Sequence, residues 1–151
     1  MAEPNRRVLV VAHQTAATPA LLHAVRERAA RGNARVHLVV PASAHGLHRV
    51  VDPEDNGAEE AREALEVALP RLREAAGSEV TGEVGDWQPL SAIHDAVNRE
   101  PFDEIIISTL PRRLSRWLKL DLVSKARGLG LPVRHVEAPL PVEASGAGTP
   151  A

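Results

Sequence analysis

The sequence predicts an α/β fold: a five-stranded parallel sheet in the order 3-2-1-4-5 with helices on both faces, as in a Rossmann-like three-layer sandwich. Apolar or β-branched segments alternate with segments that start and stop like helices. This alternation favours parallel strands joined by right-handed crossovers. Residues 8–12 and 104–107 are the most apolar runs, with Glu104 as their one polar residue, which is typical of strands buried on both faces. Residues 79–84 alternate Val with polar residues or Gly, which indicates an edge strand.

Local signals place the individual elements. Strands are expected at residues 6–13, 35–40, 79–84, 104–109 and 133–136, with Pro41 closing the second. Helices are expected to begin at Thr18-Pro19, Ala58, Pro89 and Asp121 and to end near Gly32, Gly77, Pro101 and Gly128. A basic helix is expected after the fourth strand. Pro70 predicts a kink or a break inside the second helix, because proline has no N–H to donate.

Composition limits the classes of protein that the chain can represent. It has 151 residues, no cysteine, and a net charge of −2 from 18 basic and 20 acidic side chains. This favours one domain, residues 1–138, and a tail at 139–151 that we expect to be disordered. We expect no nucleic-acid partner, and no membrane contact because no apolar run approaches the ~20 residues that cross a bilayer. The lack of cysteine excludes disulfides and fits a cytoplasmic location.

The predicted strand order reverses between the first and fourth strands, and open α/β sheets bind ligands at the carboxyl ends of strands where this happens. His13-Gln14-Thr15 would then face the segment from Ser108 to Arg113. Ser108 and Thr109 can cap the following helix or bind a phosphate. The residues that we expect to line this ligand site are Ala12, His13, Gln14, Val39, Val40, Ser108, Thr109, Arg112, Arg113 and Arg116.

A basic segment follows the fourth strand, within residues 102–120. Arg112, Arg113, Arg116 and Lys119 would lie at or near a helix N-terminus, which itself favours anions. Two interpretations stay open: an anion site at the crevice, or a solvated helix face that pairs with surface carboxylates.

The chain resembles the universal stress protein family over residues 6–137. The stretch VLVVAHQT at 8–15 is similar to the family's first strand, and Gly85-Asp86, Pro89 and Phe102-Asp103 are similar to its third strand, third helix and fourth strand. GLPVRHVE at 130–137 is similar to the closing strand, through which the family commonly dimerises. The resemblance therefore implies a homodimer that pairs through residues 132–137, an unpaired apolar edge.

The resemblance also implies a nucleotide site whose phosphate motif is degenerate. ATP-binding members carry Gly-x2-Gly-x9-Gly-Ser/Thr after the fourth strand, and these positions fall here on Ser108, Pro111, Asp121 and Leu122. Glycine lets a backbone approach phosphates, whereas Pro111 removes an N–H and fixes φ. His13 stands where the ATP-binding members place an aspartate that contacts the nucleotide.

Three functions remain open on these grounds. The first is a non-catalytic regulatory protein of the universal stress type that binds a small anion or nucleotide in an altered pose. The second is the same fold with conventional ATP binding, and ATP stays open as a cofactor. The third is a nucleotide-using enzyme, although no Gly-x-Ser-x-Gly or Gly-x-Gly-x-x-Gly motif is present. No metal is expected, because no carboxylate completes a ligand set with His37, His45 and His48.

Overall fold

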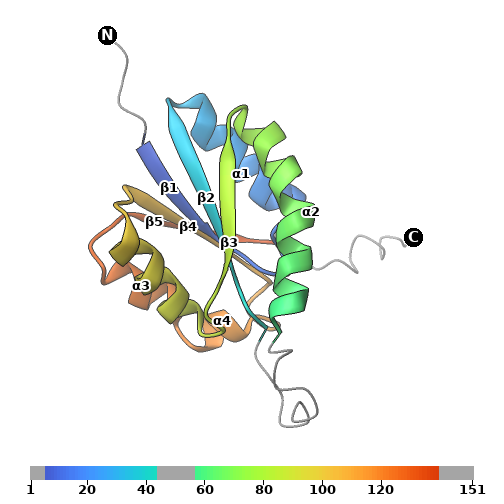
Figure 1. The fold of residues 1–151 in the computed structure, drawn as a ribbon. Coiled ribbons are helices and arrows are strands. Elements are labelled where there is room, and N and C mark those ends of the chain that lie inside the picture. Colours follow the sequence, from blue (N-terminus) through green and yellow to red (C-terminus); the bar gives the residue numbers. More distant parts are fainter. Residues whose placement is uncertain (1–5, 44–56, 140–151) are drawn as a thin grey trace.

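The computed structural model describes residues 6–43 and 57–139 (Figure 1). Its elements are β1 (Arg6–Val11), α1 (Pro19–Ala30), β2 (Ala34–Pro41), α2 (Ala58–Ala76), β3 (Val80–Gly85), α3 (Pro89–Arg99), β4 (Glu104–Thr109), α4 (Arg116–Lys119), α5 (Leu122–Arg127) and β5 (Val133–Glu137). The strands form one five-stranded sheet in the order β3-β2-β1-β4-β5, and every pair is parallel. The predicted fold class and strand order are confirmed.

The middle of each central strand, residues 8–11 in β1 and 105–107 in β4, is apolar because it contributes to two cores. Val8 and Val10 of β1 pack with α1 and α2, whereas Leu9 and Val11 pack with α3 and α5. Successive side chains of a strand point to opposite faces, so an alternating sequence could not fill both layers. Figure 1 shows the two helical layers, with α1 and α2 on one side of the sheet and α3 and α4 on the other.

The predicted edge strand is β3, which pairs with β2 alone in the sheet. Gly82 in its middle lets α2 approach closely. A Cβ at that position would lie 2.6 Å from Cδ1 of Leu65 and 3.2 Å from the carbonyl oxygen of Leu38. The glycine that breaks the Val pattern therefore serves the packing of α2 on the sheet.

The helix α2 runs without interruption through Pro70, so the prediction of a break there is wrong. Pro70 is exposed on the outer face, where water can take over the carbonyl that its missing N–H leaves free. Gly77 ends the helix in the left-handed conformation at φ 69°, and its N–H donates to the Arg73 carbonyl at 2.9 Å.

The basic segment differs most from its prediction, because Arg112 and Arg113 are not helical. Pro111 opens a turn in which the Leu114 N–H donates to the Pro111 carbonyl at 2.8 Å. Ser115 then caps α4 by accepting from the Leu118 N–H at 3.1 Å, so the helix begins only after it and has four residues. Of the four basic residues expected at the start of one helix, Arg116 and Lys119 lie on α4, and Arg112 and Arg113 lie in the turn before it.

Smaller departures concern the ends of elements. β1 stops at Val11 rather than residue 13, and Pro41 is the last residue of β2 rather than the residue after it. Asp121 precedes α5 as predicted, but its side chain makes no capping hydrogen bond. No helix within residues 6–43 and 57–139 is both long and apolar enough to span a bilayer. The expected disordered tail lies, beyond residue 139, outside the described part of the chain.

Candidate functional site

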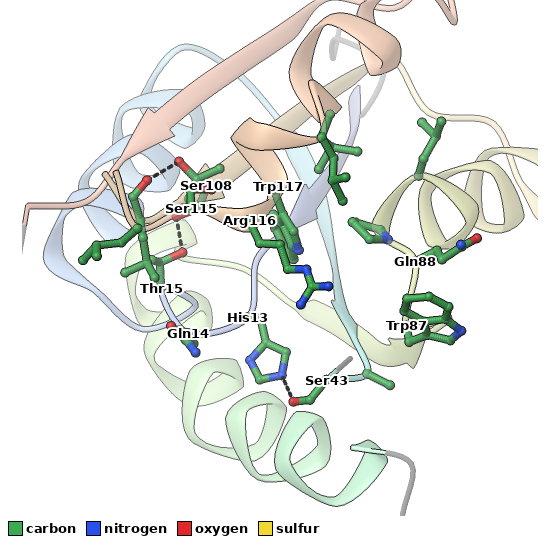
Figure 2. A pocket seen from close by; sticks show the side chains of 18 of the residues that line it. His13, Gln14, Thr15, Ser43, Trp87, Gln88, Ser108, Ser115, Arg116 and Trp117 are labelled. Atoms are coloured by element: carbon green, nitrogen blue, oxygen red, sulfur yellow. Dashed lines mark hydrogen bonds between the residues drawn. The ribbon is translucent and has the colours of Figure 1, made fainter. Parts of the chain in front are cut away.

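A cavity of about 710 Å³ lies where the strand order reverses, at the carboxyl ends of β1 and β4 (Figure 2). Loops at the ends of β2 and β3 and the start of α2 complete its walls. The strand order alone dictates this position, because the connections after β1 and β4 leave the sheet toward opposite faces. A volume of this size is typical of small-molecule sites.

Of the residues predicted for the ligand site or the phosphate motif, six line the cavity: His13, Gln14, Ser108, Thr109, Arg116 and Leu122. Seven others do not line it: Ala12, Val39, Val40, Pro111, Arg112, Arg113 and Asp121. The first three of these are buried in the cores, so their side chains are not available to a ligand. The backbone N–H of Arg112 donates to Glu137 Oε2 at 3.0 Å, away from the crevice.

A hydrogen-bond chain crosses one wall of the cavity and fixes which ring nitrogen of neutral His13 carries the hydrogen. The Ser43 hydroxyl donates to Glu60 Oε1 at 2.6 Å, because a carboxylate only accepts. The same hydroxyl oxygen lies 2.9 Å from His13 Nε2 and must therefore accept from an Nε2–H (Figure 2). Burial lowers the pKa of His13 below its ordinary value, and the charge of Glu60 opposes this in part.

The opposite nitrogen of the same ring has no hydrogen-bond partner. His13 Nδ1 is buried and unpaired among the described residues. In the neutral tautomer set by Ser43 this atom is an acceptor, and protonating it would place an unpaired N–H in the same buried position. His13 is therefore held in its neutral form at pH 7.

Two buried hydroxyls join the β1 end of the cavity to the β4 end. Thr15 Oγ1 and Ser108 Oγ lie 2.6 Å apart, across 93 residues of sequence. Ser115, also buried, lies at the start of α4 and lines the same cavity. These hydroxyls give the cavity a polar but uncharged floor, able to hydrogen-bond either donors or acceptors.

Thr109 connects the cavity to the edge strand β5. Its hydroxyl donates to the Leu110 carbonyl at 2.8 Å and therefore accepts from His135 Nε2, also at 2.8 Å. Burial lowers the pKa of His135, and the nearby Glu137 carboxylate acts in the opposite direction. The end of β4 is thus held to β5 beside the cavity wall.

The rim of the cavity is apolar. Trp87, Leu114 and Leu120 all line it, although each is about half exposed to solvent. Trp117 lines it too and packs against the core beneath α3 and α5. Arg116 and Trp117 project into the cavity from α4 (Figure 2).

Sequence reasoning missed Ser43, Glu60, Trp87 and Lys125 as lining residues. Ser43 and Trp87 follow the carboxyl ends of β2 and β3, so the rule that located His13 and Ser108 would have found them too. Glu60 and Lys125 lie on helices, where no local pattern marks them. The described residues hold no group of three or more potential metal ligands, and His45 and His48 lie outside them.

The fold and the crevice define an open, doubly wound α/β protein with a ligand-sized cavity at its topological switch point. Within that class the chain has the fold of universal stress proteins. Residues of this chain superpose on the Lactobacillus plantarum universal stress protein UspA with a TM-score of 0.65 and 20% identity, covering 89% of this chain and 99% of that one.

Two further solved structures agree. The Archaeoglobus fulgidus universal stress protein gives a TM-score of 0.62 and 19% identity over 87% of this chain and 93% of that chain. A universal stress protein in complex with cAMP gives a TM-score of 0.61 and 16% identity, covering 89% of this chain and 98% of that chain. The sequence matches no protein-family model and no curated protein. At these identities the likeness establishes the fold, and the resemblance seen in the sequence is confirmed at that level.

Proposed function

We propose that this protein is a divergent, non-catalytic regulatory protein of the universal stress type, which binds a nucleotide or a similar small anion in the crevice between β1 and β4. The observation that carries the proposal is the cavity of about 710 Å³ at that crevice. Structures with the same fold hold cAMP, dAMP and AMP. The hydroxyls of its floor can hydrogen-bond a sugar or a base.

The positive charge of the site supports an anion as the ligand. Arg116 and Lys125 line the cavity and Glu60 is the acidic residue among its walls, so the lining carries a net positive charge with His13 neutral. The guanidinium group can hold a phosphate or carboxylate in a bidentate manner. The sequence-based anion site is therefore kept, with Arg116 in place of the full basic cluster.

Isothermal titration calorimetry with AMP and cAMP tests the proposal. We expect saturable binding of one nucleotide per chain, weakened at least about tenfold by Arg116→Glu, because a charge-assisted contact contributes about 1.5–3 kcal/mol. Arg113→Glu is the matched control: it makes the same charge reversal three residues away, on an exposed side chain that does not line the cavity.

Equal losses in the two variants would show that general charge, and not the crevice, attracts the anion. No binding of AMP or cAMP at millimolar concentration would reject the nucleotide proposal. ATP with magnesium belongs in the same series, since tight ATP binding would favour the second hypothesis, conventional ATP binding.

The proposal includes a homodimer that forms through β5. This strand pairs with β4 alone in the sheet, which leaves one side of its backbone unpaired within the described residues. The N–H of Ile105 donates to the Pro132 carbonyl and that of Ala138 to the Thr109 carbonyl, so the intervening odd-numbered residues direct their backbone outward. Such an edge invites pairing with a second copy.

Val133→Pro tests the dimer, because it removes an outward N–H without touching the β4 ladder. Light scattering at tens of micromolar should find a dimer for the natural chain and a larger monomer fraction for the variant. A natural chain that is monomeric under these conditions would overturn the dimer. The cytoplasmic location is likewise part of the proposal, and cell fractionation tests it.

A further inference from the structure

The apolar rim of the crevice stands out from the rest of the surface. Four large hydrophobic side chains in the described residues are about half exposed: Val67, Trp87, Leu114 and Leu120. The last three line this one cavity, at 47%, 52% and 50% exposure, and they come from three separate connections of the chain. A gathering of exposed apolar groups around a cavity is typical of a site that contacts an apolar part of a ligand.

The charges of the same cavity are few. Its cationic lining, within the described residues, consists of Arg116 and Lys125, and Glu60 offsets one of them. Arg112 and Arg113 do not line it. Pro111 has no N–H, so the turn after β4 offers one donor fewer to a polyphosphate than a glycine-rich loop would. The cavity therefore suits a ligand that carries little negative charge.

We propose that the crevice selects a ligand with one terminal anionic group and a planar apolar body, in preference to a polyphosphate. The anionic group pairs with Arg116 and Lys125, and the apolar body lies against Trp87, Leu114 and Leu120. This inference rests on the proposed function, because both place the ligand in the same cavity. It adds the chemistry of the ligand, which extends beyond nucleotides.

The probe is 1-naphthyl phosphate, which carries one phosphate and a planar apolar body without the hydrogen-bonding groups of a nucleobase. Inorganic phosphate serves as the same anion without the body. Calorimetry should give naphthyl phosphate at least about tenfold higher affinity than phosphate, because burying an aromatic face contributes more than the ~1.4 kcal/mol that a factor of ten requires. AMP should bind at least as tightly as ATP with magnesium.

Variants of the rim separate apolar contact from charge. Trp87→Ser and Leu114→Ser should each weaken naphthyl phosphate several-fold and leave inorganic phosphate unchanged. Val67→Ser is the matched control, because Val67 is 53% exposed on α2 and does not line the cavity. Since all three side chains are half exposed, the variants are expected to fold, and thermal melts followed by circular dichroism check this.

The outcomes distinguish this inference from the proposed function. Rim-dependent binding of naphthyl phosphate without any binding of AMP supports the inference and rejects the nucleotide proposal. AMP binding that the rim variants leave unchanged rejects the inference and retains the nucleotide proposal. Equal affinities for naphthyl phosphate and phosphate, or ATP binding tenfold tighter than AMP, also reject the inference. If the rim variants turn a dimer into a monomer in light scattering, the rim is a contact between copies and the inference is wrong.

Discussion

The buried hydroxyl pair of Thr15 and Ser108 allows a quantitative test of how the crevice is built. Ser108→Ala removes one partner and leaves the Thr15 hydroxyl without the contact that the structure records at 2.6 Å. Thr15 is 2% and Ser108 1% exposed, so water touches little of either side chain. A buried hydroxyl left unpaired costs about 1–3 kcal/mol of the free energy of unfolding.

Thr15→Val makes the complementary change, because valine has nearly the shape of threonine without its hydroxyl. Removing both hydroxyls leaves no unpaired polar group, so the double variant should lose less stability than the sum of the single losses. The expected coupling energy is about 1–2 kcal/mol. With a urea m-value of about 2 kcal/mol/M, each single variant should lower the unfolding midpoint by about 0.5–1.5 M.

Urea unfolding followed by circular dichroism measures all four proteins of this double-mutant cycle. Wild-type m-values in the variants would show that the two-state comparison is sound. Single losses that add within about 0.5 kcal/mol would refute the reasoning, since they would mean that the two hydroxyls do not depend on each other. A stabilised Ser108→Ala variant would contradict it even more directly.

Two further predictions concern pH and backbone conformation. The pKa of His13 is below its ordinary value of 6.5 in the folded chain, so the unfolded chain takes up a proton first as pH falls, and stability should decrease from pH 7.5 through 6.5. The urea midpoint of His13→Gln should fall less over this pH range than that of the natural chain. The difference between the two midpoints at pH 8 gives the part of the effect that does not depend on pH. If the midpoints of both proteins change equally with pH, the burial argument is wrong. Asp121 has φ 61° and Gly77 has φ 69°, a left-handed backbone that glycine adopts most easily. Asp121→Gly should therefore raise the free energy of unfolding by up to about 1 kcal/mol, and Gly77→Ala should lower it by about 1 kcal/mol. The two variants should shift the urea midpoint in opposite directions. Shifts of the same sign would show that contacts, rather than the left-handed backbone, decide the outcome.

The fold could be predicted from the sequence because burial leaves a clear pattern in the strands. Residues 8–12 and 105–107 must fill two cores at once, and β3 must fill little more than one. These demands identify the central and edge strands and, with the crossover rule, the strand order. The same order locates the crevice, which is why His13 and Ser108 were found without knowledge of any side-chain contact.

The residues that line the crevice were less predictable, because they depend on where the helix after each strand begins. Four basic residues within eight positions predict one helix face, but the turn that Pro111 opens and the cap that Ser115 provides delay the helix to Arg116. A single capping hydrogen bond thus decides which arginine lines the cavity. Trp87 and Lys125 come into the site from different elements, and only the assembled layers bring them together.

Pro111 and Asp121, two of the three positions where the resemblance would place a glycine, have different backbones. Asp121 keeps a left-handed backbone at φ 61°, a conformation that glycine adopts freely and that aspartate tolerates better than most residues. The left-handed turn between α4 and α5 therefore forms with aspartate in place of glycine. Proline cannot take a positive φ at all, so Pro111 changes the turn itself. Pro111 thus decides the turn that follows β4, while the left-handed Asp121 leads into α5, which carries Lys125 to the cavity.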